Sequence, residues 1–248
     1  MTGAMRERAA SLAPLILLAA LAAMVLALVT ERVAFRPLRG ANPETLLVSS
    51  FAVSFFLEKT LIMAVGARPK GVDFLPGLAR QVAVAGVRLQ LLHLVTIAMS
   101  LALLAGATWL LQATRLGLEM RAAAENFRMA EVLGVRANRV IAAAFAISGL
   151  LAAAVACMIV AQTGLVQPRM GLQLVVIAFV GTVIGGLGSL PGAAIGGFFV
   201  GVGTILLQAL LPGALRPFRE AFVFAVVAVV LIVRPLGLFP SRSLRQRI

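Results

Sequence analysis

The sequence predicts an all-α fold, a polytopic transmembrane helical bundle. Of the 248 residues, 61% are hydrophobic and only 12% are charged, whereas a soluble domain carries about twice that share of charge. The apolar residues form long runs, and a run of about 20 crosses a bilayer as a helix. The runs are longer than barrel strands and lack their alternation of polar and apolar residues. Backbone groups without hydrogen bonds are not tolerated in lipid, so helices are favoured. We therefore interpret residues 1–248 as a single transmembrane domain.

Seven hydrophobic segments are candidate spans. In chain order they are residues 12–30, 46–65, 89–111, 140–160, 172–187, 193–211 and 221–233. The first follows Arg6 and Arg8, as in a signal peptide, but it has no clean cleavage site and is interpreted as a retained span. The second contains Glu58 and Lys59, which must face protein or water rather than lipid. The last is short, so the charges at its ends must snorkel to the interface.

A glycine-rich tract divides the uncharged stretch between residues 170 and 215, which is too long for one span. Its turn residues and the glycines around it are Gly185, Gly186, Gly188, Pro191, Gly192 and Gly196. Several glycines recur at four-residue spacing, which places them on one helix face and lets a neighbouring backbone approach closely. Tight helix packing is favoured over direct substrate contact, and a re-entrant turn that lines a pathway stays open.

Positive charge indicates the orientation of the chain. The net charge is +13, and arginines are more numerous in the loops after the first and third segments and in the C-terminal tract than on the other side. These regions are therefore expected to be cytoplasmic and to meet anionic lipid headgroups. Binding of nucleic acid is excluded as an interpretation, because few aromatic residues are interleaved with the basic ones.

Residues 114–139 form the longest polar tract on the cytoplasmic side. Between Leu118 and Leu133 the tract has no Gly or Pro and is rich in Ala, Glu, Met and Arg, so we expect one helix that ends at Gly134. Met129, Val132 and Leu133 lie at helical spacing with charges between them. Such an amphipathic helix lies in the headgroups or docks into a groove of another protein, and composition leaves both open.

Residues 124–134, followed by 139–141, resemble the coupling loop of the branched-chain amino acid permeases of ABC importers. Residues 31–40, 185–197 and 234–239 resemble the same family in the same order, so the resemblance covers nearly the whole chain. It implies a cytoplasmic coupling loop at 114–139 that docks into an ATPase. The coupling residues are expected to be Glu125, Arg128, Met129, Leu133 and Gly134, with Met129 and Leu133 as anchors.

The resemblance also implies a location and partners. It places the chain in the bacterial inner membrane, as a multi-pass permease subunit that carries branched-chain amino acids or related small amino acids and amides. The implied partners are a second, related permease, two ABC ATPase subunits and a periplasmic or lipid-anchored substrate-binding protein. No charged pocket residue identifies a site for the zwitterion, although Glu58 and Lys59 are a candidate pair.

Two departures from the family pattern stand out. Members usually begin with a further hydrophobic segment and an Asn-Phe-Ala-His-Gly-like tract, neither of which is matched here, so we expect that an N-terminal segment is missing. In the loop, Arg128-Met129-Ala130 replaces the Glu-Ala-Ala of the wider ABC pattern, although Gly134 is in register.

Motifs for catalysis, metals and cofactors are not found in the sequence. Lys59 precedes Thr60 but follows Glu58 rather than Gly, so no phosphate loop forms and ATP must be hydrolysed by a partner. His93 has no cluster of ligands near it, and Cys157 is alone in an apolar stretch. No Ser-His-Asp set is evident, so we expect no enzyme. Two alternatives remain: a secondary transporter, which needs broken helices at matching positions in two repeats, and a non-transporting scaffold or degenerate permease.

Overall fold

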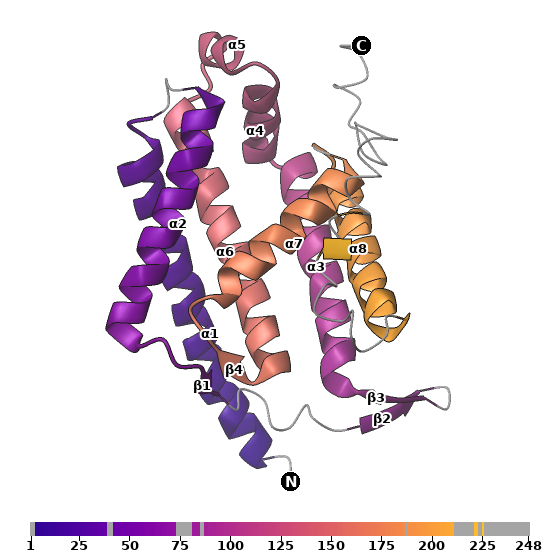
Figure 1. Cartoon of the computed structure of the whole chain (residues 1–248). Coiled ribbons are helices and arrows are strands. Elements are labelled where there is room, and N and C mark those ends of the chain that lie inside the picture. The colour runs from indigo at the N-terminus through magenta and orange to yellow at the C-terminus, as the bar shows by residue number, and fades with distance from the viewer. Residues whose placement is uncertain are drawn as a thin grey trace. The chain divides into compact units, whose positions relative to one another are not determined.

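The computed structural model describes residues 3–38, 42–72, 81–84, 87–186, 188–210, 221–222 and 225. The chain divides into two compact units, Met1–Pro168 and Arg169–Ile248. The helices of the first unit are α1 (Gly3–Thr30) with its π-helical extension η1 (Glu31–Phe35), α2 (Pro43–Val65), α3 (Leu91–Ala113), α4 (Arg115–Glu125), α5 (Phe127–Val132) and α6 (Ala137–Thr163). The second unit contains α7 (Met170–Gly185) and α8 (Leu190–Leu210) (Figure 1).

The predicted all-α membrane fold is confirmed. Within the described ranges, five helical stretches are long and apolar enough to cross a bilayer: Pro14–Phe35, Val48–Val65, Leu91–Ala113, Asn138–Thr163 and Leu190–Leu207. The fifth predicted segment, 172–187, corresponds to the shorter apolar helix α7. The seventh, 221–233, lies almost entirely outside the described residues. Long apolar runs become helices because in lipid only a helix satisfies its backbone within the segment.

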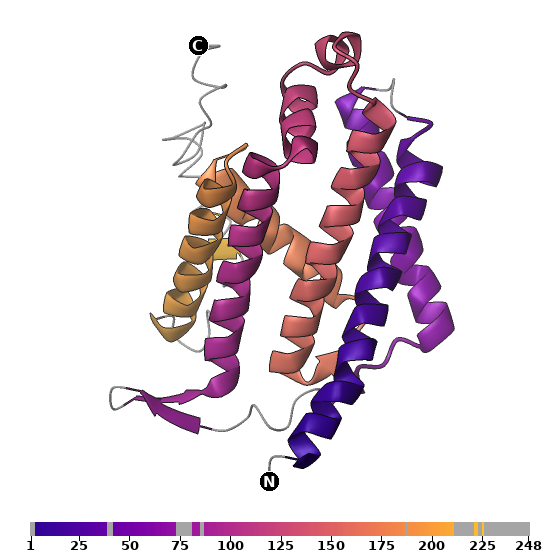
Figure 2. The same ribbon diagram turned by 180° about the vertical axis from the view of Figure 1, so that it is seen from behind.

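Helices α1 and α6 form the closest helix pair of the first unit and run in opposite directions, side by side in both views (Figure 1 and Figure 2). Gly149 of α6 lies against α1: a Cβ added there would be 2.9 Å from the Ala23 carbonyl oxygen and 2.9 Å from the Ala27 Cβ. Further along, the rings of Phe35 and Phe145 pack with their centroids 5.3 Å apart. The missing side chain at Gly149 therefore lets the two backbones approach closely.

Two short antiparallel strand pairs, for which the sequence has no clear signal, lie in the loops. Strand β1 (Lys70–Gly71) follows α2 and pairs with β4 (Leu165–Val166), which follows α6. Next to this pair, the Val72 amide donates to the Gly164 carbonyl oxygen at 2.8 Å. Strands β2 (Gln81–Val84) and β3 (Val87–Gln90) form a hairpin that leads directly into α3, so that helix begins two residues later than its predicted span. The β1–β4 pair ties the ends of α2 and α6 together.

The turn between α7 and α8 is narrower than expected. Gly186 and Gly188 take positive φ angles of 107° and 88°, which glycine adopts without steric cost. The Ser189 hydroxyl then accepts a hydrogen bond from the Gly192 amide at 3.1 Å and caps α8. Pro191 and Gly192 therefore belong to the first turn of α8 rather than to the turn itself, because proline is compatible with the start of a helix.

Glycines meet across the α7–α8 crossing. A Cβ on Gly181 would lie 2.8 Å from the Gly197 Cα, and one on Gly196 would lie 2.5 Å from the Gly185 amide nitrogen and would also strike the Gly181 carbonyl oxygen. A Cβ on Gly185 would strike the Gly192 carbonyl group. The two helices thus touch backbone to backbone, with no room for larger residues at these positions.

Candidate functional site

The α4–α5 segment, 115–132, begins at a tight turn after α3. The Thr114 hydroxyl donates to the Leu110 carbonyl oxygen at 2.5 Å and accepts from the Gly117 amide at 3.1 Å. Gly117 is buried in this turn, and a Cβ there would lie 2.5 Å from the Leu110 carbonyl oxygen and would strike that of Leu111. Helix α4 also packs on α3 and α6. The turn therefore requires glycine and fixes α4 against two of the spans.

The prediction of one helix from Leu118 to Leu133 is wrong. Helix α4 ends at Glu125, and Asn126 is extended, with φ −152° and ψ 100°. The Asn126 Oδ1 atom accepts a hydrogen bond from the Met129 amide at 3.1 Å, which caps the start of α5. Asparagine favours such a cap over a place in a helix interior, since its side chain competes for backbone donors. The chain changes direction at this point, and α5 lies beyond the ends of α4 and α6 (Figure 1).

Gly134 ends α5 in the left-handed region, with φ +87°, as expected of a glycine after an amphipathic run. Its amide donates to the Glu131 carbonyl oxygen at 3.0 Å, and the Val135 amide donates to the Ala130 carbonyl oxygen at 3.0 Å. This pair of bonds is the Schellman arrangement, which satisfies carbonyl groups at a helix end. Both ends of α5 are thus fixed by specific hydrogen bonds.

Four apolar side chains of α5 and its C-terminal end are exposed, and three of them are more exposed than Phe127, at 40%. Met129 is 57% exposed, Val132 is 82% exposed and Leu133, just beyond the helix, is 77% exposed. We call these three residues the α5 surface. The predicted coupling residues Glu125 and Arg128 are also exposed and lie beside it. Inside, Ala130 is buried at 3% exposure and anchors the helix.

Exposed apolar residues of this size on so short a helix indicate an interaction site. Such a cluster can lie in the lipid headgroups or insert into a groove of a partner protein, where a few anchor residues supply most of the binding energy. The structure places the predicted coupling residues Met129, Leu133 and Gly134 at α5 and its C-terminal end. The sequence analysis did not single out Thr114, Gly117 and Asn126, which form the turn and the cap on either side of α4. The signal for Asn126 was present, since asparagine within a run of helix formers is a typical N-cap residue.

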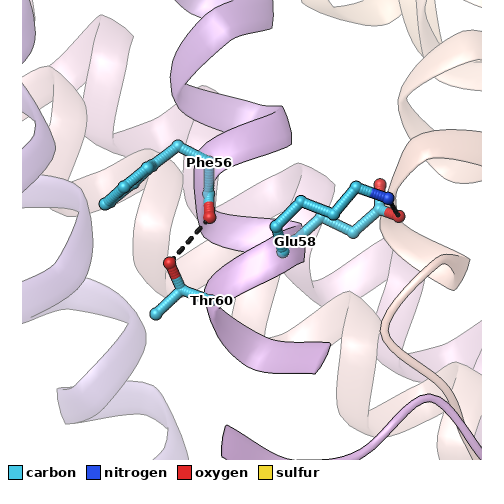
Figure 3. Close-up of polar contacts among 4 residues, drawn as sticks. Phe56, Glu58 and Thr60 are labelled. Atoms are coloured by element: carbon cyan, nitrogen blue, oxygen red, sulfur yellow. Dashed lines mark hydrogen bonds and ion pairs between the residues drawn. The ribbon is translucent and has the colours of Figure 1, made fainter. Parts of the chain in front are cut away.

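The charged pair of α2 lies within the span Val48–Val65. The Lys59 Nζ atom is 3.9 Å from Glu58 Oε1, with side-chain exposures of 61% for the lysine and 10% for the glutamate (Figure 3). The neighbouring Thr60 hydroxyl donates to the Phe56 carbonyl oxygen at 2.8 Å, within the same helix. Glu58 therefore faces protein, as its position in a span requires, while Lys59 projects outward.

The remaining reactive side chains are separate from one another. His93 lies in the first turn of α3, and Cys157 is a half-buried free cysteine in α6. Among the residues that the structure describes, no group of three or more His, Cys, Asp or Glu side chains is placed to hold a metal ion. The features that stand out are therefore the α5 surface, the intramembrane pair and the glycine crossing.

Comparisons with known proteins identify the family of the chain. The family "Branched-chain amino acid transport system / permease component" matches residues 1–233. The high-affinity branched-chain amino acid transport system permease protein BraD of Pseudomonas aeruginosa is 31% identical over 233 residues, covering 91% of this chain and 75% of the relative. LivH of Salmonella typhimurium, with the same description, is 32% identical over 215 residues, or 84% of this chain and 68% of the relative.

A relative that matches about half of the chain belongs to a different import system. The autoinducer 2 import system permease protein LsrC of Klebsiella pneumoniae is 35% identical over 137 residues, or 52% of this chain and 40% of the relative. No solved structure matches the chain. With the family match extending over 1–233 and the membrane helices in place, the chain is a multi-pass membrane protein that belongs to the permease family of branched-chain amino acid transport systems.

Proposed function

We propose that this chain is the permease subunit of an ATP-driven importer in the bacterial inner membrane, carrying branched-chain amino acids or related small amino acids and amides. The names of BraD and LivH support the substrate class. The observation that carries the coupling role is the α5 surface, an exposed apolar cluster held at both ends by capping hydrogen bonds. The family match favours a permease of an importer over the secondary transporter or scaffold that the sequence also allowed.

The proposed partners are a second, related permease, two ATPase subunits and a substrate-binding protein. This sequence has no phosphate loop, so the ATP is hydrolysed by the ATPase subunits. In this scheme their closure on ATP pushes α5. Helix α4 contacts α5 on one side and both α3 and α6 on the other, so the push reaches two spans directly. The spans then shift between two packings, which is the general form of such a switch.

The docking of α5 can be tested by cysteine cross-linking. The chain has one cysteine, Cys157, so Met129→Cys in a Cys157→Ala background gives a single reactive site on the α5 surface. We expect Met129→Cys to cross-link to a co-expressed ATPase subunit in a nucleotide-dependent manner. Lys70→Cys is the matched control, because Lys70 is also exposed but lies in β1, at the other end of the spans.

Uptake of radiolabelled leucine by proteoliposomes tests the function itself. The assembled importer should accumulate leucine only when ATP and the leucine-loaded binding protein are both present. The proposal is wrong if Met129→Cys cross-links in no nucleotide state and the assembled subunits show no ATP-dependent uptake of any amino acid.

A further inference from the structure

Lys59 of α2 has an unusual position for a charged residue. The span that contains it extends from Val48 to Val65, so Lys59 lies about 9 Å along the helix axis from the nearer end at 1.5 Å per residue. Charged side chains at such a depth are costly in hydrocarbon, and they typically face protein or a water-filled path. Lys59 is nevertheless 61% exposed in the isolated chain. Something other than lipid must therefore meet its ammonium group.

The contact with Glu58 leaves that ammonium group available. The 3.9 Å between Nζ and Oε1 is too long for a hydrogen bond, which would need about 3 Å. An ammonium group carries three donors, and the side chain of Lys59 is 61% exposed. The carboxylate of Glu58 is thus close enough to balance the charge of Lys59 without occupying its donors.

Lys59 also lies in an apolar stripe. Phe51, Phe55, Lys59 and Met63 follow one another at four-residue spacing and share one face of α2. Their apolar members are strongly exposed, at 56% for Phe51, 51% for Phe55 and 88% for Met63. We call this face the Lys59 stripe. It offers one cation, a nearby carboxylate and apolar surface on both sides of them.

We propose that Lys59 receives the carboxylate of an amino acid during its passage across the membrane, an inference that rests on the proposed function. The ligand's aliphatic side chain lies on Phe55 or Met63, the apolar neighbours of Lys59 in the stripe. The ion pair and the zwitterion each have zero net charge, so their association buries no net charge in the membrane. This matching matters because an unpaired charge out of water costs several kcal/mol. The acyl chains of lipids carry no anion, so they cannot supply a partner for the ammonium group of Lys59.

Charge-removing variants of the whole importer test this assignment in proteoliposomes, at saturating leucine-loaded binding protein. Lys59→Met should lower the maximal rate of leucine uptake about 10–100-fold, the value of one charge-assisted hydrogen bond. Lys59→Arg should retain most of the rate, because it keeps the cation. ATPase stimulation by the binding protein should persist in both variants, since the coupling segment is unchanged.

The double variant Glu58→Gln/Lys59→Met separates substrate contact from a structural ion pair. If the pair only stabilises the fold, removing both charges together restores uptake. If Lys59 receives the substrate, the double variant stays as slow as Lys59→Met. Recovery of uptake in the double variant would therefore overturn the assignment. So would normal uptake by Lys59→Met itself.

A second measurement does not require transport by the variant. Lys59→Cys in the Cys157→Ala background should react with a charged, membrane-impermeant methanethiosulfonate reagent, and leucine-loaded binding protein should slow the reaction several-fold. Trp109→Cys is the control, because Trp109 is a 66% exposed residue of the α3 span and should not react. An unreactive Lys59→Cys would show that lipid or another subunit covers the stripe and would overturn the proposal. If the wild-type importer carries no amino acid, it is instead the proposed function that fails.

Discussion

Replacing Gly134 by valine perturbs the end of α5 without touching any neighbour. An added Cβ would meet nothing within 4 Å, so the whole cost lies in the backbone, whose φ is +87°. A non-glycine residue in the left-handed region costs about 1–2 kcal/mol, and a β-branched residue is among the least tolerated there. The chain can avoid this cost only by rotating out of the left-handed region.

That rotation breaks the two hydrogen bonds that end α5, from Gly134 to Glu131 and from Val135 to Ala130. Each contributes about 1 kcal/mol, so either route costs about 2 kcal/mol. A penalty of this size is large for a helix of six residues, because short helices are marginal without tertiary support. Leu133, which directly precedes Gly134, would then leave its place on the α5 surface.

The assay is ATP-driven leucine uptake, normalised to the amount of chain inserted in the membrane. About 2 kcal/mol shifts the equilibrium between the formed and the unformed coupling surface roughly 30-fold, so uptake by Gly134→Val should fall by up to about that factor at equal insertion. Gly134→Asn is the matched control, because asparagine visits the left-handed region readily, and it should stay within about threefold of wild type. Equal uptake by Gly134→Val and wild type would refute the reasoning, as would an equal loss in both variants.

Three further changes test other parts of the structure. Leu133→Asp should abolish ATP-driven uptake but leave insertion intact, because the side chain is 77% exposed in the chain and would be buried against the ATPase in the proposed docking. A variant that still transports would contradict docking. Asn126→Ala should weaken α5 by about 1 kcal/mol through loss of the cap and make the loop more sensitive to limited proteolysis, whereas Asn126→Asp should behave as wild type. Gly196→Ala should destabilise the fold by about 1–3 kcal/mol through overpacking and so lower the melting temperature in detergent. Gly197→Ala should not, because a Cβ at Gly197 meets nothing within 4 Å. Similar melting temperatures for the two variants would contradict the close crossing.

The membrane helices were predictable because a single physical requirement dominates them. A long apolar run in lipid must satisfy its backbone internally, so the predicted segments 12–30, 46–65 and 140–160 lie within α1, α2 and α6. The strands were not predictable in the same way. Lys70 pairs with Val166 only because the ends of α2 and α6 lie close together. That proximity arises from tertiary packing, and no pattern in the local sequence indicates it.

The α4–α5 segment shows where reasoning from propensity fails. Alanine, glutamate, methionine and arginine all favour a continuous helix, and that preference holds as far as Glu125. It does not account for the Asn126 side chain, which captures the Met129 amide and starts a second helix. Gly134 was predictable because a glycine after an amphipathic run has one common role, whereas Gly117 is required by the path of α3, which the sequence does not specify.

The intramembrane pair shows a similar limit. Because Glu58 and Lys59 lie within a predicted span, the sequence implied that both avoid lipid. Neighbouring residues on a helix point about 100° apart, however, so the two side chains cannot face the same surroundings. Which of the two turns inward depends on the packing of the chain around α2. The exposures of 10% and 61% therefore came from the structure alone, and they single out Lys59 as the residue that a ligand can reach.

The short length of α7 has a consequence for how the protein enters the membrane. Its 16 residues extend about 24 Å, less than the roughly 30 Å of a hydrocarbon core. Alone, such a helix would have to thin the bilayer around it, at a cost that grows with each ångström of mismatch. Helix α8 follows after a turn of few residues and meets α7 backbone to backbone at the glycines. We therefore expect the insertion machinery to retain α7 until α8 has been synthesised and to release the two helices into the bilayer together, as a hairpin.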